Sequence, residues 1–330
     1  MNRISRRRVL AGGLAAGGVS MLRPRAARAA SKIRVVTNWF AEPEHGGLYH
    51  AVEAGFYEKA GLDVELKQGG PQLNSMQLLA GGEADVIMSY DIQIMSAYEK
   101  GVPVKAFFTC FQFDLIGLLT RPDVSSLADL KGRKVYFAGN GYSTYWPWLK
   151  KKYGYTDDMA GPKGPNLQTF LVDPTSAVAG YITSEPYVAE KQNVATKFFL
   201  FASEGYPSYA NTMATTSAFI DSNRDALARF TKASVEGWKA YMADPSTGNA
   251  LIKRTNAKMD DGQIEFGLRK MREVKAIESG DAATMGVGII TEERWKKTRD
   301  FLVEAGLLKA ETDYMKSMTT EFIKDVKIVM

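Results

Sequence analysis

The chain has 330 residues, of which 45% are hydrophobic and 24% are charged, a balance typical of a folded globular protein. Its formal net charge of +5 comes from residues 1–29, which hold seven arginines and no acidic residue, so removing them changes the net charge from +5 to −2. A slightly acidic chain excludes the broad basic surface that nucleic-acid binding needs, and we expect no nucleic-acid partner.

The first 29 residues have the features of an export signal. Residues 5–10 read SRRRVL, which resembles the twin-arginine motif, and a weakly hydrophobic stretch rich in glycine and alanine follows over 9–22. Residues 27–29 read ARA, the small-x-small pattern that signal peptidase recognises, so we expect cleavage after Ala29 and a periplasmic mature protein. An N-terminal membrane anchor is the alternative. Beyond residue 29 no segment reaches 18 consecutive apolar residues, so we expect no membrane-spanning helix.

Residue types that carry chemistry are few and scattered. Cys110 is the single cysteine and lies in an apolar run, so we expect a small buried side chain and no internal disulfide. The two histidines, His45 and His50, do not form an H-E-x-x-H motif, and no cysteine cluster lies near them. Residues 139–141 (GNG) lack the third glycine of a dinucleotide-binding loop. We therefore expect no metal, no cofactor and no enzymatic activity.

The rest of the chain alternates between strand and helix patterns. Short β-branched runs predict strands at 33–37, 64–66, 84–88, 103–108, 115–119, 135–138 and 169–172. Apolar residues at helical spacing predict helices at 46–60, 71–80, 91–100, 126–130, 143–153, 175–183 and over most of the chain after 221, with Pro71 opening the second and Asp91 capping the third. This alternation favours an α/β fold with mainly parallel sheets. The pattern restarts after Phe113 without a linker, which predicts two lobes joined by chain crossings, with a cleft between them.

Four segments in a fixed order carry a family resemblance. They are residues 38–49 (NWFAEPEHGGLY), 79–86 (LAGGEADV), 126–135 (SLADLKGRKV) and 180–187 (GYITSEPY). Together they resemble the periplasmic binding proteins grouped with the thiamine-pyrimidine synthases, a group that includes binders of nitrate, sulfonates, taurine, formylaminopyrimidine and riboflavin. The resemblance implies a type II periplasmic binding fold, with lobe 1 at 32–112 and 209–330 and lobe 2 at 113–208. It also implies a monomer that holds a small molecule between the lobes, bends near 112–114 and 207–211, and delivers its ligand to an ABC permease in the inner membrane.

The same group contains enzymes, and this sequence departs from them. The fungal pyrimidine synthases use a lysine that holds pyridoxal phosphate, a histidine four residues later and a cysteine-rich run. Here Ser89 stands at the lysine position and Gln93 at the histidine position, and Cys110 stands alone. Without a lysine amine no Schiff base forms, so these departures favour a binding protein over a synthase.

Loops that follow the predicted strands are rich in aromatic and polar residues, and ligands of α/β folds sit at such loops. Aromatic rings there suit stacking on a flat ligand. Ser143 and Thr144 lie near a helix start, where free N–H groups bind acceptor atoms, although plain helix capping is their alternative role. Glu185 precedes Pro186, which predicts an extended backbone and a carboxylate that accepts N–H donors from an aminopyrimidine-like ring. The candidate ligand-binding residues are Asn38, Trp39, His45, Ser89, Tyr90, Asn140, Tyr142, Ser143, Thr144, Glu185 and Tyr187.

Arginine is scarce in predicted lobe 2, where Arg121 and Arg133 are the two examples, so a small strong anion lacks its usual bidentate partner. We therefore expect a planar heteroaromatic ligand similar to a thiamine-precursor pyrimidine. A nitrate, sulfonate or taurine binder of the same fold is the first alternative. A periplasmic enzyme and a ligand-sensing partner of a membrane receptor are the others.

Overall fold

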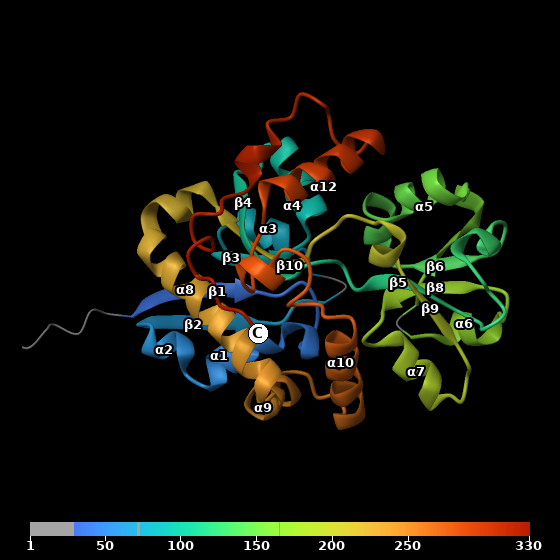
Figure 1. Ribbon diagram of the computed structural model, residues 1–330, viewed down its shortest axis with the longest axis horizontal. Helices are drawn as coiled ribbons and strands as arrows, with labels where there is room; N and C mark the ends of the chain where they lie inside the picture. Colours follow the sequence, from blue (N-terminus) through green and yellow to red (C-terminus); the bar gives the residue numbers. More distant parts are fainter. Residues whose placement is uncertain (1–29, 71–72, 165) are drawn as a thin grey trace, which may run out of the picture.

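The computed structural model describes residues 30–70, 73–164 and 166–330, and the predicted export signal lies outside them. The described chain forms two mixed sheets with helices packed on them, so the expected α/β class is confirmed (Figure 1). The expectation of mainly parallel sheets was wrong, because half of the strand pairings in each sheet are antiparallel. We call the part of the molecule built on each sheet a lobe.

The sheet of lobe 1 has the strand order β2-β1-β3-β10-β4. Its strands are β1 (Ser31–Val36), β2 (Leu62–Lys67), β3 (Val86–Ser89), β4 (Val104–Phe111) and β10 (Ala210–Thr216). β1 pairs in parallel with β2 and β3, whereas β10 runs antiparallel to both β3 and β4. β10 is the strand that enters this sheet after the chain has returned from lobe 2. Since β1 and β3 are parallel, the loops that follow them leave from the same edge of the sheet.

Helices pack on this sheet through glycines and large aromatic residues. They are α1 (Gly46–Glu53), α2 (Phe56–Lys59), α3 (Ser75–Ala80), α4 (Asp91–Glu99), α8 (Ser217–Ala243), α9 (Ser246–Thr255), α10 (Asp261–Glu273), α11 (Ala282–Met285) and α12 (Glu292–Glu304). A Cβ atom at Gly46 would overlap the Tyr241 ring, and one at Gly47 would overlap the Trp238 ring. The two glycines therefore let α1 lie closely on α8. Trp238 is fully buried, and burial of a large apolar side chain contributes roughly 1.5–3 kcal/mol to folding.

The sheet of lobe 2 has the strand order β7-β6-β8-β5-β9. Its strands are β5 (Ile116–Thr120), β6 (Val135–Phe137), β7 (Ala160–Pro162), β8 (Ala177–Tyr181) and β9 (Lys197–Leu200), and its helices are α5 (Trp146–Tyr153), α6 (Gln168–Val172) and α7 (Glu185–Lys191). β6 is parallel to β7 and β8, whereas β5 is antiparallel to β8 and β9. The loops after β6 and β8 therefore leave from one edge of this sheet, as those after β1 and β3 do in lobe 1.

The chain passes between these sheets from β4 to β5 and returns from β9 to β10. The two crossing segments lie side by side, because the Asp114 amide donates to the Ser208 carbonyl, 3.0 Å away. The buried Asp91 carboxylate holds the return crossing, since it accepts hydrogen bonds from Ser208 Oγ (2.7 Å), Tyr209 N (3.0 Å) and Thr298 Oγ1 (2.7 Å). The N-cap of α4 is Tyr90 and Asp91 is its first residue, so the predicted cap position was wrong, although the Asp91 carboxylate also accepts from Ile92 N at 2.8 Å.

The secondary-structure prediction was wrong over residues 168–181, where helix and strand are exchanged. α6 was predicted as a strand and β8 as a helix. The alanine-rich sequence of β8 suggested a helix, but β8 is a central strand between β6 and β5, with four of its five residues buried. Small residues fit such a position, and the packing of neighbouring strands outweighs local propensity.

Other predicted helices also differ from the structure: α5, expected over 143–153, begins at Trp146, and the helix expected over 126–130 is the 3-10 helix η2 (Leu127–Leu130). The helix expected over 46–60 is divided into α1 and α2 at Gly55, whose φ of +70° is a left-handed conformation that glycine adopts without strain. α3 begins at Ser75, where the Asn74 side chain accepts from Gln77 N at 3.2 Å, and Pro71 lies outside the described residues.

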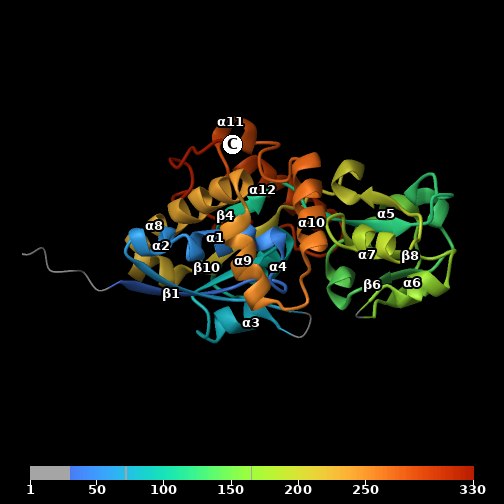
Figure 2. The ribbon, with the colours of Figure 1, turned by 90° about the horizontal axis from the view of Figure 1, so that it is seen from below.

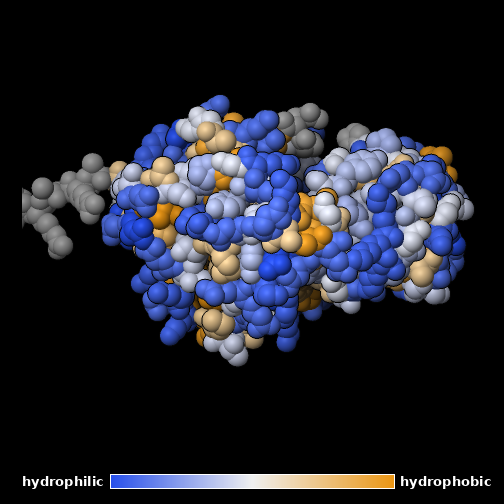
Figure 3. Space-filling model, turned by 90° about the horizontal axis from the view of Figure 1, so that it is seen from above, coloured by the Kyte–Doolittle hydropathy of each residue, from blue (hydrophilic) through white to orange (hydrophobic). Residues whose placement is uncertain are grey.

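Within the described ranges, no helix is long and apolar enough to cross a bilayer. Figure 3 shows a largely hydrophilic face, with a small group of apolar residues where the lobes meet. Cys110 is buried, as predicted, and burial raises the pKa of its thiol to about 12, so the thiol is unreactive at neutral pH. No group of three His, Cys, Asp or Glu side chains in the described part of the chain is arranged to hold a metal ion.

Candidate ligand-binding site

The strand-end edges of the two lobes face one another. Tyr90 follows β3 in lobe 1 and Tyr181 ends β8 in lobe 2, and their hydroxyl oxygens lie 2.7 Å apart. Loops that leave these edges supply most of the candidate residues. We call the facing groups the interlobe site and define it by Asn38, Glu42, Glu44, Tyr90, Lys163, Tyr181, Thr183 and Glu185.

A chain of amide groups holds the loop after β1. Asn211 Nδ2 donates to the Glu44 carbonyl (2.7 Å), and Asn211 Oδ1 accepts from Asn38 Nδ2 (3.0 Å). Asn38 Oδ1 then accepts from His45 Nε2, 2.9 Å away. This order requires a neutral His45 with its proton on Nε2, and burial lowers the pKa of His45 to about 3. Asn38 and His45 thus have structural partners in lobe 1, and Asn211 adopts a left-handed φ of +52° that asparagine tolerates better than most residues.

Glu185 forms an ion pair within lobe 2. Its carboxylate accepts from Lys163 Nζ at 2.5 Å, from Tyr181 N at 2.7 Å and from the Ser184 hydroxyl. Burial alone raises the pKa of Glu185, but Lys163 and these donors hold it below its usual value. A Cβ atom at Gly180 would overlap the Glu185 side chain, so the glycine leaves room for this carboxylate to fold back.

The expected extended backbone at Glu185 was wrong. Glu185 is the first residue of α7, and Pro186 occupies the first turn of that helix. A proline is tolerated there because the N–H groups of a first turn have no intrahelical partner. The helix start also explains how Glu185 reaches the Tyr181 amide, four residues earlier.

Two acidic residues of the site were missed by the sequence analysis. Glu42 and Glu44 flank Pro43 in the short helix η1 (Pro43–His45) and its cap. Burial, followed by repulsion from Glu185, raises the pKa of Glu44 above its usual value, and burial with repulsion from Glu44 raises that of Glu42 further. Their signal in the sequence is two acids spaced two residues apart in a loop that follows a strand.

Three aromatic residues of these loops stay exposed. Trp39 and Phe40 are 39% and 37% exposed, and their rings meet edge to face with centroids 5.6 Å apart. Tyr142, in the turn η3 (Gly139–Ser143), is 51% exposed and rests on Phe137 with centroids 4.8 Å apart. Trp39, Phe40 and Tyr142 therefore offer ring faces that the core does not use.

The polar candidates of the same loops have local partners. The Asn140 carbonyl accepts from Ser143 Oγ (3.2 Å) and from Thr144 Oγ1 (3.0 Å), so both hydroxyls close their own turn. Ser89 is buried and donates to Gln93 Oε1 at 3.1 Å.

Tyr187 lies on α7, away from the strand ends. Its hydroxyl donates to Asp260 Oδ1 at 2.9 Å, and Lys191 Nζ approaches the other Asp260 oxygen at 2.9 Å. Asp260 caps α10, so these bonds join α7 of lobe 2 to α10 of lobe 1, which lie beside each other in Figure 2. Tyr187 thus lies in a contact between lobes.

Four tyrosines, which include the Tyr90–Tyr181 pair, lie close to Asp114. Burial raises the pKa of Tyr90, Tyr145, Tyr181 and Tyr206, and in each case repulsion from Asp114 raises it further. Asp114 is 5% exposed, and burial raises the pKa of its carboxyl to about 7. The crossing segment therefore carries a carboxyl group that titrates near neutral pH.

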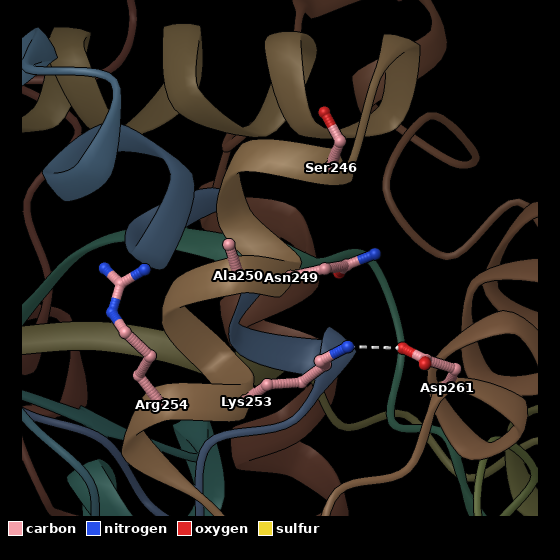
Figure 4. A pocket seen from close by; sticks show the side chains of 6 residues that line it. All are labelled: Ser246, Asn249, Ala250, Lys253, Arg254 and Asp261. Carbon is pink, nitrogen blue, oxygen red and sulfur yellow. Dashed lines mark hydrogen bonds and ion pairs between the residues drawn. The ribbon is translucent and has the colours of Figure 1, made fainter.

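Two surface hollows lie apart from the interlobe site. One, of about 590 Å³, lies against α9 and the start of α10, and Figure 4 shows its lining of Ser246, Asn249, Ala250, Lys253, Arg254 and Asp261. Its charges are already paired, because Lys253 contacts Asp261 (2.8 Å) and Arg254 contacts Glu53 (2.6 Å). The other, of about 300 Å³, lies between α5 and α12. Neither hollow contains a residue of the interlobe site.

Comparison of the sequence with known families identifies the family of this chain. A family model described as NMT1/THI5 like matches residues 42–248, which include most of the interlobe site. The chain belongs to the NMT1/THI5-like family. This membership confirms the resemblance that the four sequence segments indicated.

Relatives within the family include binding proteins and synthases. The chain is 25% identical over 238 residues to the riboflavin-binding protein RibY of Chloroflexus aurantiacus, covering 70% of this chain and 68% of that protein. It is 24% identical over 290 residues to the formylaminopyrimidine-binding protein of Halalkalibacterium halodurans, covering 82% and 86%. It is also 26% identical over 147 residues to the 4-amino-5-hydroxymethyl-2-methylpyrimidine phosphate synthase of Schizosaccharomyces pombe, covering 43% and 42%.

Solved structures share the fold. The alkanesulfonate-binding protein SsuA of Xanthomonas axonopodis superposes with a TM-score of 0.66 at 13% identity, covering 88% of this chain and 99% of that one. The fold is therefore that of the periplasmic binding proteins, as the NMT1/THI5-like resemblance implied.

Proposed function

We propose that this NMT1/THI5-like protein is the periplasmic solute-binding component of an ABC importer, and that it binds a small planar heteroaromatic of the thiamine-precursor type between its lobes. The observation that carries this proposal is the Tyr90–Tyr181 contact, which brings the loop-bearing edges of both lobes together. Exposed rings on those loops, such as Trp39 and Tyr142, suit stacking on a flat ligand. Two relatives, matched over 68% and 86% of their lengths, have names that specify riboflavin and formylaminopyrimidine, both of which are planar heteroaromatics.

The arginines of lobe 2 support a heteroaromatic over a small anion. Arg121 donates to the carbonyls of Phe170 (3.3 Å) and Leu171 (3.2 Å), and its guanidinium lies over the Phe170 ring. Arg133 pairs with Asp123 at 3.6 Å. Both arginines are thus engaged within lobe 2, and neither offers the bidentate contact that sulfonate or nitrate favours.

A synthase function receives no support from the site. Ser89 stands at the position of the synthase lysine and is buried against Gln93, so it offers no amine for pyridoxal phosphate. A binding protein needs no such group. The proposed transport role requires instead that the lobes close around a ligand, which lets a permease distinguish loaded from empty protein.

Native mass spectrometry of the protein purified from the periplasm tests the proposal. We expect a bound species whose mass and fragments identify a nitrogen heterocycle, released when the protein is denatured. Recovery of taurine or an alkanesulfonate in its place would favour the anion-binding alternative. A pyridoxal adduct would favour the enzyme.

A further inference from the structure

An unpaired carboxylate lies at the junction of the lobes. Glu44 is 3% exposed, and its Oε2 atom is buried without a hydrogen-bond partner. Opposite it, the Thr183 hydroxyl of lobe 2 is fully buried and also has no partner. Burying a carboxylate without a partner costs several kcal/mol, so such a group is retained where a ligand or a function compensates for it.

The Glu44 carboxylate is directed at lobe 2. Burial is the main cause of the raised pKa of Glu44, the Thr183 hydroxyl lowers that pKa as a nearby hydrogen-bond donor, and the charge of Glu185 raises it, so both residues lie close to the carboxylate. The backbone of α10 packs against both the Glu44 loop and the Thr183 loop. A Cβ atom at Gly267 would lie 3.3 Å from Pro43 Cγ and 3.6 Å from the Thr183 carbonyl. Gln263 Nε2 donates to that same carbonyl at 3.0 Å. Glu44 and Thr183 therefore face one another where α10 packs against both lobes.

The position of Glu44 is fixed. Its carbonyl accepts from Asn211 Nδ2, and its neighbour His45 is bonded to Asn38. The loop thus has little freedom to turn the carboxylate out to water. A fixed, buried acceptor is suited to select among ligands by charge, because the cost of its burial is recovered only by a partner that carries positive charge or N–H donors.

Acidic side chains outnumber basic ones at the interlobe site. Its ionisable acids are Glu42, Glu44 and Glu185, and its one cation is Lys163. Lys163 already contacts Glu185 at 2.5 Å and donates to the Ala179 carbonyl at 2.9 Å. Lys163 also attracts Glu42, so Glu44 is left without a cation of its own in the defined site, which disfavours an anionic ligand and favours one that brings positive charge.

We infer that Glu44 is the specificity-determining residue of the interlobe site and that the ligand is a planar ring with a positively charged amino substituent, which reaches the Glu44 carboxylate when the lobes close on it. This inference rests on the proposed function, because it assigns a charge class to the heteroaromatic ligand. Glu42 adds to the negative potential, and Glu185 stays paired with Lys163.

Calorimetry at pH 7 tests this inference with three pyrimidines that share the same ring but differ in charge. They are 4-amino-5-aminomethyl-2-methylpyrimidine, which is a cation, the neutral 5-hydroxymethyl compound and the anionic 5-carboxylate. We expect the wild-type protein to bind the cation roughly tenfold or more tightly than the neutral ring, the size of one charge-assisted hydrogen bond, and the anion most weakly. Glu44→Gln should abolish most of that preference.

Glu190→Gln is the matched control, since Glu190 is an exposed acid on α7 and the change in net charge is the same. It should keep the wild-type preference. Thermal melting of each variant checks folding, and Glu44→Gln should melt no lower than the wild type because it removes an unpaired buried charge. An anion that binds as tightly as the cation, or a preference that survives Glu44→Gln, would overturn the inference.

The proposed function fails separately from this inference. If the neutral ring or riboflavin binds but Glu44→Gln leaves the order of affinities unchanged, the heteroaromatic-binding function stands and the role of Glu44 is refuted. If no planar ring binds and taurine or nitrate does, both are refuted.

Discussion

The hydroxyl of Tyr90, after β3, lies 2.7 Å from the hydroxyl of Tyr181, at the end of β8. Tyr90→Phe and Tyr181→Phe each remove this bond and keep the ring. Because both changes remove this shared interaction, we expect each single variant to weaken binding of 4-amino-5-hydroxymethyl-2-methylpyrimidine by about 2- to 10-fold, and the double variant to weaken it by less than the product of the two factors. Calorimetry of the three variants measures these factors. Losses that add in the double variant would show that the hydroxyls act independently.

Trp39 offers a second test of the binding loops. Its side chain is 39% exposed, so Trp39→Ala should change the melting temperature little. We expect it to weaken heteroaromatic binding by roughly 1–3 kcal/mol, the sum of lost stacking and lost burial. Met285→Ala, at a comparably exposed site on α11, is the control and should bind as the wild type does. Equal affinities of the Trp39→Ala variant and the wild type would remove Trp39 from the ligand site.

Asp114 predicts a pH dependence of stability. Burial raises the pKa of its carboxyl to about 7, whereas the unfolded chain has an ordinary value of roughly 3.9. The folded protein therefore holds this proton more tightly than the unfolded chain, and the carboxyl destabilises the fold progressively as pH rises from about 4 to about 7. Asp114→Asn removes this titration. Between pH 5 and pH 8 the melting temperature of the wild type should fall relative to that of the variant, and parallel pH profiles would contradict the prediction.

The export prediction concerns residues 1–29, which lie outside the described residues, and it can be tested separately. Residues 5–10 resemble a twin-arginine motif and precede a weakly hydrophobic stretch, which suits that route better than the general secretory one. Replacing Arg6 and Arg7 together by lysine should leave precursor in the cytoplasm, as fractionation and immunoblotting would show. Sequencing of the mature N-terminus should find it at or near Ala30. Normal periplasmic accumulation of the double variant would refute the twin-arginine route.

The fold could be predicted from the sequence where local pattern and packing agree. Strand and helix alternation identified the α/β class, and the apolar run around Cys110 indicated burial, which the structure confirms. At β8 the local sequence pattern and the packing disagree. Its two alanines are good helix formers, yet pairing with β6 and β5 makes the segment a strand. Which strands become neighbours depends on contacts far apart in the chain, and a local pattern does not contain them.

The site could be predicted as a set of loops but not as a set of partners. The sequence indicated Tyr90 and Glu185 as polar groups near strand ends, where the structure places them. It did not indicate that Lys163 neutralises Glu185, because the two meet only after β6 and β8 pair. Nor did it distinguish Glu44 from an ordinary surface acid, since its burial depends on contact between the lobes.

The central claim is that the interlobe site binds a planar heteroaromatic, and calorimetry of the wild-type protein tests it most directly. The titrants are 4-amino-5-hydroxymethyl-2-methylpyrimidine, riboflavin, taurine, an alkanesulfonate and nitrate, each under the same buffer and salt. We expect saturable binding of at least one heterocycle with one site per chain and no heat from taurine, the alkanesulfonate or nitrate. Saturable binding of taurine, the sulfonate or nitrate, with no heat from either heterocycle, would contradict the claim.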